Sequence, residues 1–197
     1  IQTDCLIVGA GPAGLATAIH LADLAKKFNQ PVNILLIDKG ASVGAHTLSG
    51  AIINPAVFRE LLPETPASEM PFESPVKHDE VLFLTKDRSF KIPFHPPYMG
   101  NKGNYVASLG KVVRWLASIA EKKGVQIYPG FSAHELLFED GKLVGIETGA
   151  SGIDIHGKQL PNYQPPTVVR SKVIVLAEGP RGHLSTSLIE QLGLGSR

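Results

Sequence analysis

A glycine turn between an apolar run and a helical pattern is the feature that most constrains this fold. Residues 5–8 are apolar, and Gly9, Gly11 and Gly14 follow them in a G-x-G-x-x-G spacing. Apolar residues then recur at helical intervals through residues 15–25. A strand, a tight turn and a helix in this order are typical of a dinucleotide-binding βαβ unit.

Each position of the turn has a mechanical reason. The first glycine permits the tight turn, the second lets the backbone approach a pyrophosphate, and the third lets the helix pack on the strand. A proline at the first helical position lacks a backbone N–H, but an N–H at this position has no hydrogen-bond partner within the helix in any case. The free N–H groups of the helix start favour phosphate. The predicted pyrophosphate contacts are Gly9, Gly11, Pro12, Ala13 and Gly14.

A second buried strand is expected over residues 32–37, and it ends at Asp38. The two strands of a βαβ unit are parallel, so Asp38 is expected beside the glycine turn. A carboxylate there can accept both hydroxyls of an adenosine ribose and would repel a 2′-phosphate, which disfavours NADP. The alternative is a solvated strand end without a ligand.

A second glycine-containing loop, GAHTLSG at residues 44–50, follows shortly after Asp38. His46 could tune a flavin or could only order the loop through backbone hydrogen bonds. The hydroxyls of Thr47 and Ser49 could donate to phosphate or ribityl oxygens, or could cap turns. The predicted contacts of this region are Lys39, Ala45, His46, Thr47, Leu48, Ser49 and Gly50.

Later segments return the chain to the nucleotide region. A hairpin is expected around residues 86–89, a helix over 109–123, and a tight hairpin at EDGK, residues 139–142. The apolar run of residues 173–176 then ends at Ala177, Glu178 and Gly179, which we predict to contact the cofactor. In flavoproteins similar to glutathione reductase and hydroxybenzoate hydroxylase, such an element follows an inserted β-meander, which favours FAD over NAD.

The fold class that follows is α/β: an FAD/NAD(P)-binding Rossmann-like domain of the glutathione reductase/hydroxybenzoate hydroxylase type, with an inserted antiparallel β region. We expect the FAD-binding domain in residues 1–75 and 107–197. Residues 76–106 are expected to form the antiparallel insertion, at the start of a quinone- and membrane-facing domain.

Composition narrows the function classes. Nineteen Lys and Arg against eighteen Asp and Glu give a formal net charge of +1, which argues against a nucleic-acid partner. The only cysteine, Cys5, lies in an apolar run and is expected to be a buried structural thiol. One cysteine cannot supply the ligands of a zinc site or an iron–sulfur cluster.

Several stretches together resemble the amino-terminal flavin domain of the electron transfer flavoprotein–ubiquinone oxidoreductase family. They are GAGPAGLA, DKGASVGAHTLSGAIINP, NKGNYVASLGKVVRWL, EKKGVQIYPGF and AEGPRGHL, in this order. The chain departs from the family pattern at Asp38, where glutamate is usual, at Lys102, where histidine is usual, and at Pro180 and Arg181. The first change keeps the carboxylate.

The resemblance implies an oxidoreductase with FAD as the first redox centre and a 4Fe-4S cluster as the second. It implies electron transfer flavoprotein as donor, ubiquinone as acceptor, and peripheral attachment to the mitochondrial inner membrane or the bacterial cytoplasmic membrane. Family members are longer, and their cluster ligands lie downstream of the segment that this chain matches. We therefore expect a fragment that has no quinone reductase activity by itself.

Phe94, Tyr98 and Met99 lie in a proline-interrupted segment without clear periodicity. They could cap an antiparallel sheet, or they could form an apolar patch that enters a membrane surface or lines a quinone path. Lys86, Arg88 and Lys91 nearby could meet anionic lipid head groups or could simply be solvated.

Two alternative functions remain open from the sequence. The first is a related flavoprotein of the same fold, similar to geranylgeranyl reductases or to monooxygenases, which would need NAD(P)H or an isoprenoid pocket. The second is a non-catalytic nucleotide-binding module, in which the fold serves only binding or assembly.

Overall fold

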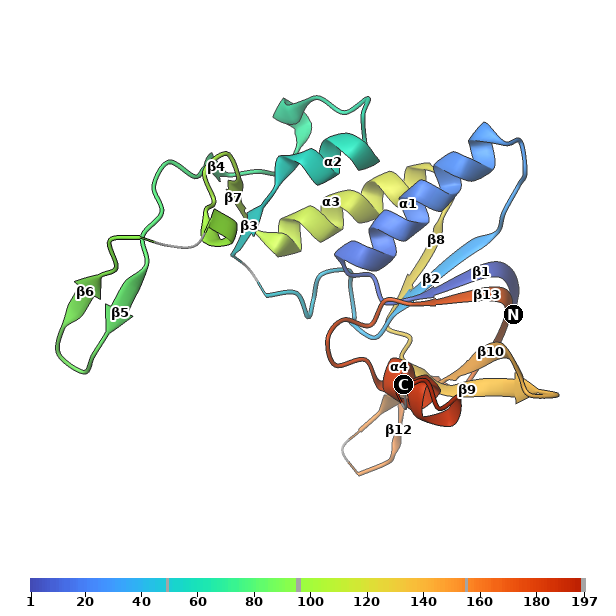
Figure 1. Ribbon diagram of the computed structural model, residues 1–197. Coiled ribbons are helices and arrows are strands. Elements are labelled where there is room, and N and C mark those ends of the chain that lie inside the picture. Colours follow the sequence, from blue (N-terminus) through green and yellow to red (C-terminus); the bar gives the residue numbers. More distant parts are fainter. Residues whose placement is uncertain (49, 95–96, 155, 196–197) are drawn as a thin grey trace. The chain divides into compact units, whose positions relative to one another are not determined.

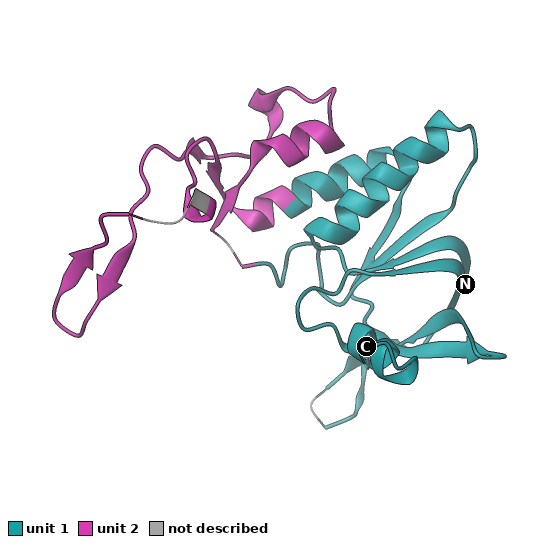
Figure 2. Ribbon diagram, in the orientation of Figure 1, with its two compact units in different colours: residues 1–47, 113–197 teal, residues 48–112 magenta. Residues whose placement is uncertain are grey.

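The computed structural model describes residues 1–48, 50–94, 97–154 and 156–195, and it divides the chain into two compact units (Figure 2). Unit 1 comprises residues 1–47 and 113–197, and unit 2 comprises residues 48–112.

Unit 1 is built on a six-stranded sheet in the order β8-β2-β1-β13-β10-β9 (Figure 1). The strands are β1 (Gln2–Val8), β2 (Ile34–Asp38), β8 (Gln126–Pro129), β9 (Ala133–Glu139), β10 (Lys142–Thr148) and β13 (Val168–Leu176). The pairs β2–β8, β1–β2 and β1–β13 are parallel, whereas β10 is antiparallel to both β13 and β9. The predicted parallel arrangement of the first two strands is confirmed.

Three helices accompany this sheet: α1 (Pro12–Lys27), α3 (Leu109–Lys122), whose first four residues belong to unit 2, and α4 (His183–Gln191). An ion pair between Lys123, just after α3, and Asp23 of α1 ties these two helices together. Helix α4 packs against β9. None of the helices in the described ranges has the length and apolar character needed to cross a bilayer.

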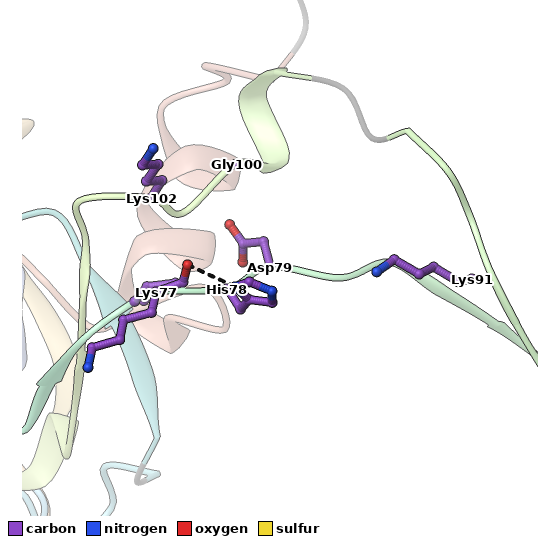
Figure 3. A pocket seen from close by; sticks show the side chains of 7 residues that line it. Lys77, His78, Asp79, Lys91, Gly100 and Lys102 are labelled. Carbon is purple, nitrogen blue, oxygen red and sulfur yellow. Dashed lines mark hydrogen bonds between the residues drawn. The ribbon is translucent and has the colours of Figure 1, made fainter.

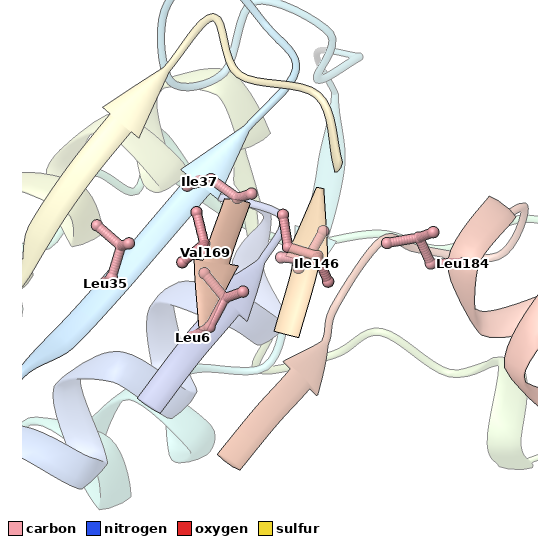
Figure 4. Packing of buried hydrophobic residues seen from close by; sticks show 7 residues of the cluster. Leu6, Leu35, Ile37, Ile146, Val169 and Leu184 are labelled. Atoms are coloured by element: carbon pink, nitrogen blue, oxygen red, sulfur yellow. The ribbon is translucent and has the colours of Figure 1, made fainter. Parts of the chain in front are cut away.

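Strands β1 and β2 are buried on both faces. On one face, Leu6 and Ile37 pack with Ile146, Val169 and Leu184, so that residues from α4 and the antiparallel strands join the core (Figure 4). On the other face, Ile7 lies against Gly14 of α1. Burial on both sides explains why these strands read as continuous apolar runs rather than as alternating patterns.

Cys5 is part of this core. Its side chain is 4% exposed, it is a free thiol, and burial raises the pKa of that thiol. A buried thiol held in its protonated form is a poor nucleophile, as expected of a structural cysteine.

The hairpin predicted at residues 139–142 joins β9 and β10, and the structure confirms it. Asp140 and Gly141 both have positive φ, 49° and 73°, as a type I′ turn requires. A second hairpin, β11 (Ser151–Ile153) with β12 (Gln159–Gln164), was not predicted. Its strands are largely exposed and carry no apolar alternation.

Unit 2 holds a three-stranded antiparallel sheet in the order β3-β7-β4 and a separate two-stranded hairpin, β5–β6. Its elements are β3 (Ala51–Ile53), α2 (Pro55–Leu61), η1 (Ala67–Glu69), β4 (Ser74–Pro75), β5 (Leu82–Leu84), β6 (Ser89–Lys91), η2 (Pro97–Met99) and β7 (Tyr105–Ala107). Asn54 caps α2 by accepting the N–H of Ala56 at 3.0 Å. Phe72 stacks on Tyr105 and meets Phe58 edge to face.

The borders of unit 2 differ from the predicted insertion at residues 76–106. Strand β7 pairs with β3, with Ala51 opposite Ala107 and Ile53 opposite Tyr105. This pairing draws residues 48–75 into the same compact unit as the hairpin. The two strands of this pair, β3 and β7, are only three residues long, which is too short for a hydrophobic periodicity to predict them from the sequence.

Candidate functional site

The turn after β1 has a shape that only glycine permits at its first position. Gly9 has a φ of +109°, and its N–H donates to the carbonyl oxygen of Ile37 at 2.8 Å. A Cβ atom at Gly9 would lie 2.4 Å from the carbonyl oxygen of Ala177. The first glycine therefore lets the ends of β1, β2 and β13 meet closely.

Gly14 serves the packing of α1 on this turn. A Cβ atom there would lie 2.0 Å from the carbonyl oxygen of Gly9 and 3.2 Å from a methyl carbon of Ile7. The third glycine of the motif therefore has the predicted role of bringing helix and strand into close contact.

Gly11 differs from both, because no contact with a described residue explains why this position is a glycine. Its φ is −79°, which other residues adopt readily, and a Cβ atom there would have no heavy atom within 4 Å. Gly11 is the N-cap of α1 and makes no side-chain capping bond, Pro12 follows it, and the first helical turn carries no acidic residue. Open space beside unpaired helix N–H groups suits an anionic ligand such as a pyrophosphate.

Asp38 links the two loops at this edge of the sheet. Its carboxylate accepts the N–H of Ala10 and the N–H of Gly40, both at 2.7 Å. Each carboxylate oxygen has two lone pairs, so capacity for ribose hydroxyls remains. The Gly40 contact is an Asx turn, which the D-x-G pattern could have revealed. The hydrogen bond from Ala10 to Asp38 joins residues 28 positions apart, so no local sequence pattern predicts it.

The second loop begins in unit 1 and ends in unit 2. Thr47 N–H donates to Gly44 at 3.1 Å and Ala45 N–H to Ser42 at 3.0 Å, so residues 42–47 form successive turns. Ala45 and His46 are exposed, as is Lys39 after Asp38, and Thr47 is half-buried. Leu48, 87% exposed, and Gly50 belong to unit 2. Ser49 lies outside the described residues, and the predicted contacts of this loop stay predictions.

The segment after β13 reaches the same edge. Ala177 N–H donates to the carbonyl oxygen of Val8 at 2.8 Å, and Gly179 has a φ of +83° with no heavy atom near a Cβ position. The structure thus brings Ala177 to Gly9, as the β13 strand end implies. Its backbone contact with a cofactor stays a prediction.

Glu178 has a role that sequence reasoning missed. Its carboxylate accepts the N–H of Ser185 at 2.8 Å, the Ser185 hydroxyl at 2.8 Å and the N–H of Leu184 at 3.2 Å. These N–H groups belong to the first turn of α4, so the Glu178 side chain caps that helix. Its predicted cofactor contact could then come only from the backbone. The sequence feature that could have predicted this cap is a glutamate a few residues before the start of a helix.

The glycine turn lies within a match to a known domain family. The model of an NAD(P)-binding Rossmann-like domain matches residues 7–60. Among solved structures, a geranylgeranyl bacteriochlorophyll reductase-like protein from Thermoplasma acidophilum superposes with a TM-score of 0.63 at 22% identity, over 90% of this chain and 39% of that one. The myxobacterial FAD-dependent halogenase CndH gives a TM-score of 0.60 at 19% identity, over 94% and 39%. The predicted fold class is confirmed.

Relatives found by sequence have a higher identity to this chain than these two structures do. The mitochondrial electron transfer flavoprotein-ubiquinone oxidoreductase of Arabidopsis thaliana is 46% identical over 98% of this chain and 30% of the relative. The Pseudomonas aeruginosa protein of the same name is 42% identical over 100% of this chain and 36% of its own length. The chain thus spans about a third of these relatives. The resemblance predicted from the motifs is confirmed: over its whole length, this chain is similar to a part of the electron transfer flavoprotein–ubiquinone oxidoreductases.

Proposed function

We propose that this chain binds FAD and is the flavin-binding part of an enzyme that transfers electrons from electron transfer flavoprotein to ubiquinone. The observation that carries the cofactor proposal is Gly11, which no contact with the described residues requires to be glycine and which borders open space at the start of α1. The donor and the acceptor come from the names of the relatives.

The residues present fit the pyrophosphate and the adenosine ribose of the dinucleotide. The backbone of residues 9–14 would hold the pyrophosphate, and Asp38 would accept the adenosine ribose hydroxyls while it keeps its bonds to Ala10 and Gly40. The loop of residues 44–50 would flank the ribityl chain, with hydroxyl donors at Thr47 and Ser49. The backbone of residues 177–179 would border the cofactor from β13.

The chemistry asks little of individual side chains. FAD, when bound, supplies an isoalloxazine ring that accepts and donates electrons. The chain would position that ring and set its surroundings, so no general acid, base or nucleophile is assigned. Besides the hydroxyls of Thr47 and Ser49, the His46 side chain could donate a hydrogen bond to the ring or to the phosphates.

A cluster would need ligands from outside this sequence. Cys5 is the only cysteine, and it is buried in the core of unit 1. A 4Fe-4S cluster takes four cysteine thiolates. We therefore propose that the cluster and the quinone site of the whole protein are built by other residues, and that these 197 residues alone do not reduce ubiquinone.

A substitution at Gly11 tests the cofactor proposal. Gly11→Ala places a methyl group in the open space without backbone strain, so the fold should persist while FAD affinity falls at least tenfold. Equilibrium dialysis with FAD measures the affinity, and thermal unfolding measures the fold. Gly195→Ala is a matched control, since its Cβ would make only an ordinary 3.6 Å contact. Equal FAD affinity in both variants and the parent chain would refute the site.

Two further measurements, binding of ADP and reduction of bound FAD by NADPH, separate the alternatives. A parent chain that binds ADP but never FAD would favour a nucleotide-binding module. Reduction of bound FAD by NADPH would favour a function like that of the geranylgeranyl reductases, since electron transfer flavoprotein–ubiquinone oxidoreductases take electrons from a protein donor.

Peripheral contact with a membrane is the second part of the proposal, and it rests on the apolar surface of unit 2. Phe94 is 76% exposed, Tyr98 86% and Met99 46%. In the β5–β6 hairpin, Phe83 and Phe90 are cross-strand partners and are 61% and 52% exposed. An isolated two-stranded hairpin is marginally stable in water. Large exposed apolar groups of this kind mark interaction surfaces.

A further inference from the structure

Two hollows of the structure differ in whether their side chains converge on one ligand. In the cleft at the root of the β5–β6 hairpin, the ends of Lys77 and Lys102 point away in different directions (Figure 3), and Lys91 is paired with Glu80 at 2.6 Å. The second hollow is a pocket of about 380 Å³ that lies wholly within unit 1. Its lining comes from the sheet of unit 1 and from the segments that border that sheet, so it is held in place by the core.

The floor of this pocket is the hydrophobic core of unit 1. Leu35 and Ile37 of β2 and Val169 of β13 line it, and all three belong to the cluster drawn in Figure 4. Tyr128 of β8 and Phe131 just after β8 form an aromatic side, in which the two rings meet edge to face with their centroids 6.3 Å apart. Aromatic rings pack favourably against such a pair. The volume falls in the range of small-molecule sites, roughly 300–1,000 Å³.

The lining of the pocket contains no charged side chain. Its other members are Ile1, Gln126, Thr148, Gln164, Pro165 and Thr167. The amino group of Ile1 donates to the carbonyl oxygen of Val168 at 2.9 Å and is thus engaged by the protein. An ion moved from water into an apolar site without a charged partner loses its solvation and gains little in return. The pocket therefore favours an uncharged ligand.

Thr148 gives the pocket a hydrogen-bond donor that the protein does not use. Its side chain is 2% exposed, and its hydroxyl oxygen accepts the backbone N–H of Thr167 at 2.9 Å. A hydroxyl group also has one hydrogen to donate, and the Thr148 hydroxyl donates to no acceptor among the described residues. Buried polar groups in native proteins usually have partners. An acceptor oxygen on a ligand in the pocket would supply the missing one.

The pocket is separate from the proposed dinucleotide site. None of the residues that line it is a predicted contact of the cofactor. The nearest link is the backbone N–H of Phe131, which donates to the carbonyl oxygen of Asp38 at 2.9 Å. The carboxylate of Asp38 is bonded elsewhere, to Ala10 and Gly40. A ligand in the pocket and a dinucleotide at the glycine turn would therefore use different residues.

We propose that this pocket binds a small uncharged aromatic molecule that carries a carbonyl oxygen. The ring packs on Leu35 and Ile37 beside the Tyr128–Phe131 pair, and the carbonyl oxygen accepts the hydroxyl hydrogen of Thr148. The inference goes beyond the proposed function and does not depend on it, since no residue of the FAD site takes part.

Equilibrium dialysis of the 197-residue chain with three naphthalene probes tests the assignment. The probe 2-acetylnaphthalene carries a ketone oxygen, 2-ethylnaphthalene has a similar shape without that oxygen, and 2-naphthoate carries a negative charge. We expect the ketone to bind about fivefold more tightly than the ethyl compound, as one hydrogen bond between uncharged groups gives. The naphthoate should bind at least about tenfold more weakly than the ketone, because the pocket offers no charged partner.

Variants separate the two parts of the proposed site. Thr148→Val keeps the shape of the side chain and removes the donor, so the preference for the ketone should disappear while 2-ethylnaphthalene still binds. Thr148→Ser should retain the preference. Tyr128→Ala opens the aromatic side and should weaken both uncharged probes about fivefold. Tyr98→Ala changes an exposed tyrosine of unit 2 and is the matched control, which should alter neither affinity.

Every other outcome overturns the proposal for a stated reason. No binding of any probe would remove the site, and equal affinity for the ketone and the ethyl compound would remove the carbonyl acceptor. Equal losses in Tyr128→Ala and Tyr98→Ala would show adsorption to exposed aromatic side chains. Release of the probes by FAD would place them in the cofactor site.

Two measurements exclude other occupants of the pocket. Probe affinity that falls as the chain concentration rises would show that a second copy of the chain covers the pocket. Probe binding by this chain that is absent from a full-length relative would assign the pocket to the rest of that polypeptide. Either result would overturn the assignment to a small molecule, whereas FAD affinity of the parent chain would stay a separate test of the proposed function.

Discussion

The three glycines of the turn after β1 have three different physical reasons. Gly9 faces the carbonyl oxygen of Ala177 and has a positive φ, and Gly14 faces the carbonyl oxygen of Gly9. Gly11 faces open space. Gly9 thus serves strand contact and Gly14 serves helix packing, whereas access for a ligand at Gly11 is part of the cofactor proposal.

At the same scale, Asp38 has a structural task beside its proposed ribose contact. Asp38→Asn presents an amide N–H₂ to one of the two backbone N–H groups that the carboxylate accepts. We expect a loss of about 2 kcal/mol in the free energy of unfolding, typical of a hydrogen bond to a charged group. Urea unfolding measures it.

A control separates geometry from charge. Asp38→Glu keeps the charge but is one methylene longer, so it should weaken the hydrogen bonds to Ala10 and Gly40 and keep ribose binding. An asparagine variant as stable as the parent chain would show that the two bonds do not stabilise the turn.

At the scale of elements, periodic segments were predictable and short ones were not. Strands β1 and β2 and helices α1 and α3 lie where apolar spacing places them. The hairpin expected around residues 86–89 corresponds to β5–β6. The three-stranded sheet of unit 2 and the β11–β12 hairpin were not predicted. Their strands are short or exposed, so they show no hydrophobic pattern, and only their pairing with other strands makes them β-strands.

The contact between Glu178 and the start of helix α4, which was not predicted from the sequence, can be tested by substitution. Glu178→Ala removes the carboxylate that accepts the N–H groups of Leu184 and Ser185. The loss of such a cap should lower the free energy of unfolding by about 1 kcal/mol. Chemical denaturation monitored by circular dichroism provides the measurement. Glu190→Ala, near the other end of the same helix, should have little effect, and equal effects of both variants would argue against capping.

At the scale of the whole molecule, the two units differ in how they are stabilised. The fully buried side chains Leu6, Ile7 and Leu36 belong to the sheet of unit 1. Strands β5 and β6 of unit 2 are exposed along their whole length. Even in unit 1, β13 pairs with β10 only through residues 168–170, so residues 171–176 have no ladder partner on that side among the described residues.

This contrast predicts unequal hydrogen exchange. The amides of β1 and β2 should exchange slowest, through global opening, whereas those of β5 and β6 should exchange within the fastest class, because little buried surface protects them. Mass spectrometry of peptides from the two regions measures the difference. Adding phosphatidylglycerol-containing vesicles should slow exchange in β5 and β6 and leave exchange in β1 and β2 unchanged. A hairpin as protected as β1 without vesicles would contradict the exposed arrangement.

The sequence by itself determined the βαβ unit, the glycine turn, the acidic residue after the second strand and the turn between β9 and β10. These depend on spacing and on backbone angles within a few residues, so local chemistry specifies them. The tertiary structure alone decided that Asp38 clamps Ala10, that Glu178 caps α4 and that β3 joins β7. Those contacts need atoms from distant positions to meet, and their energy arises only when the chain closes the loops between them.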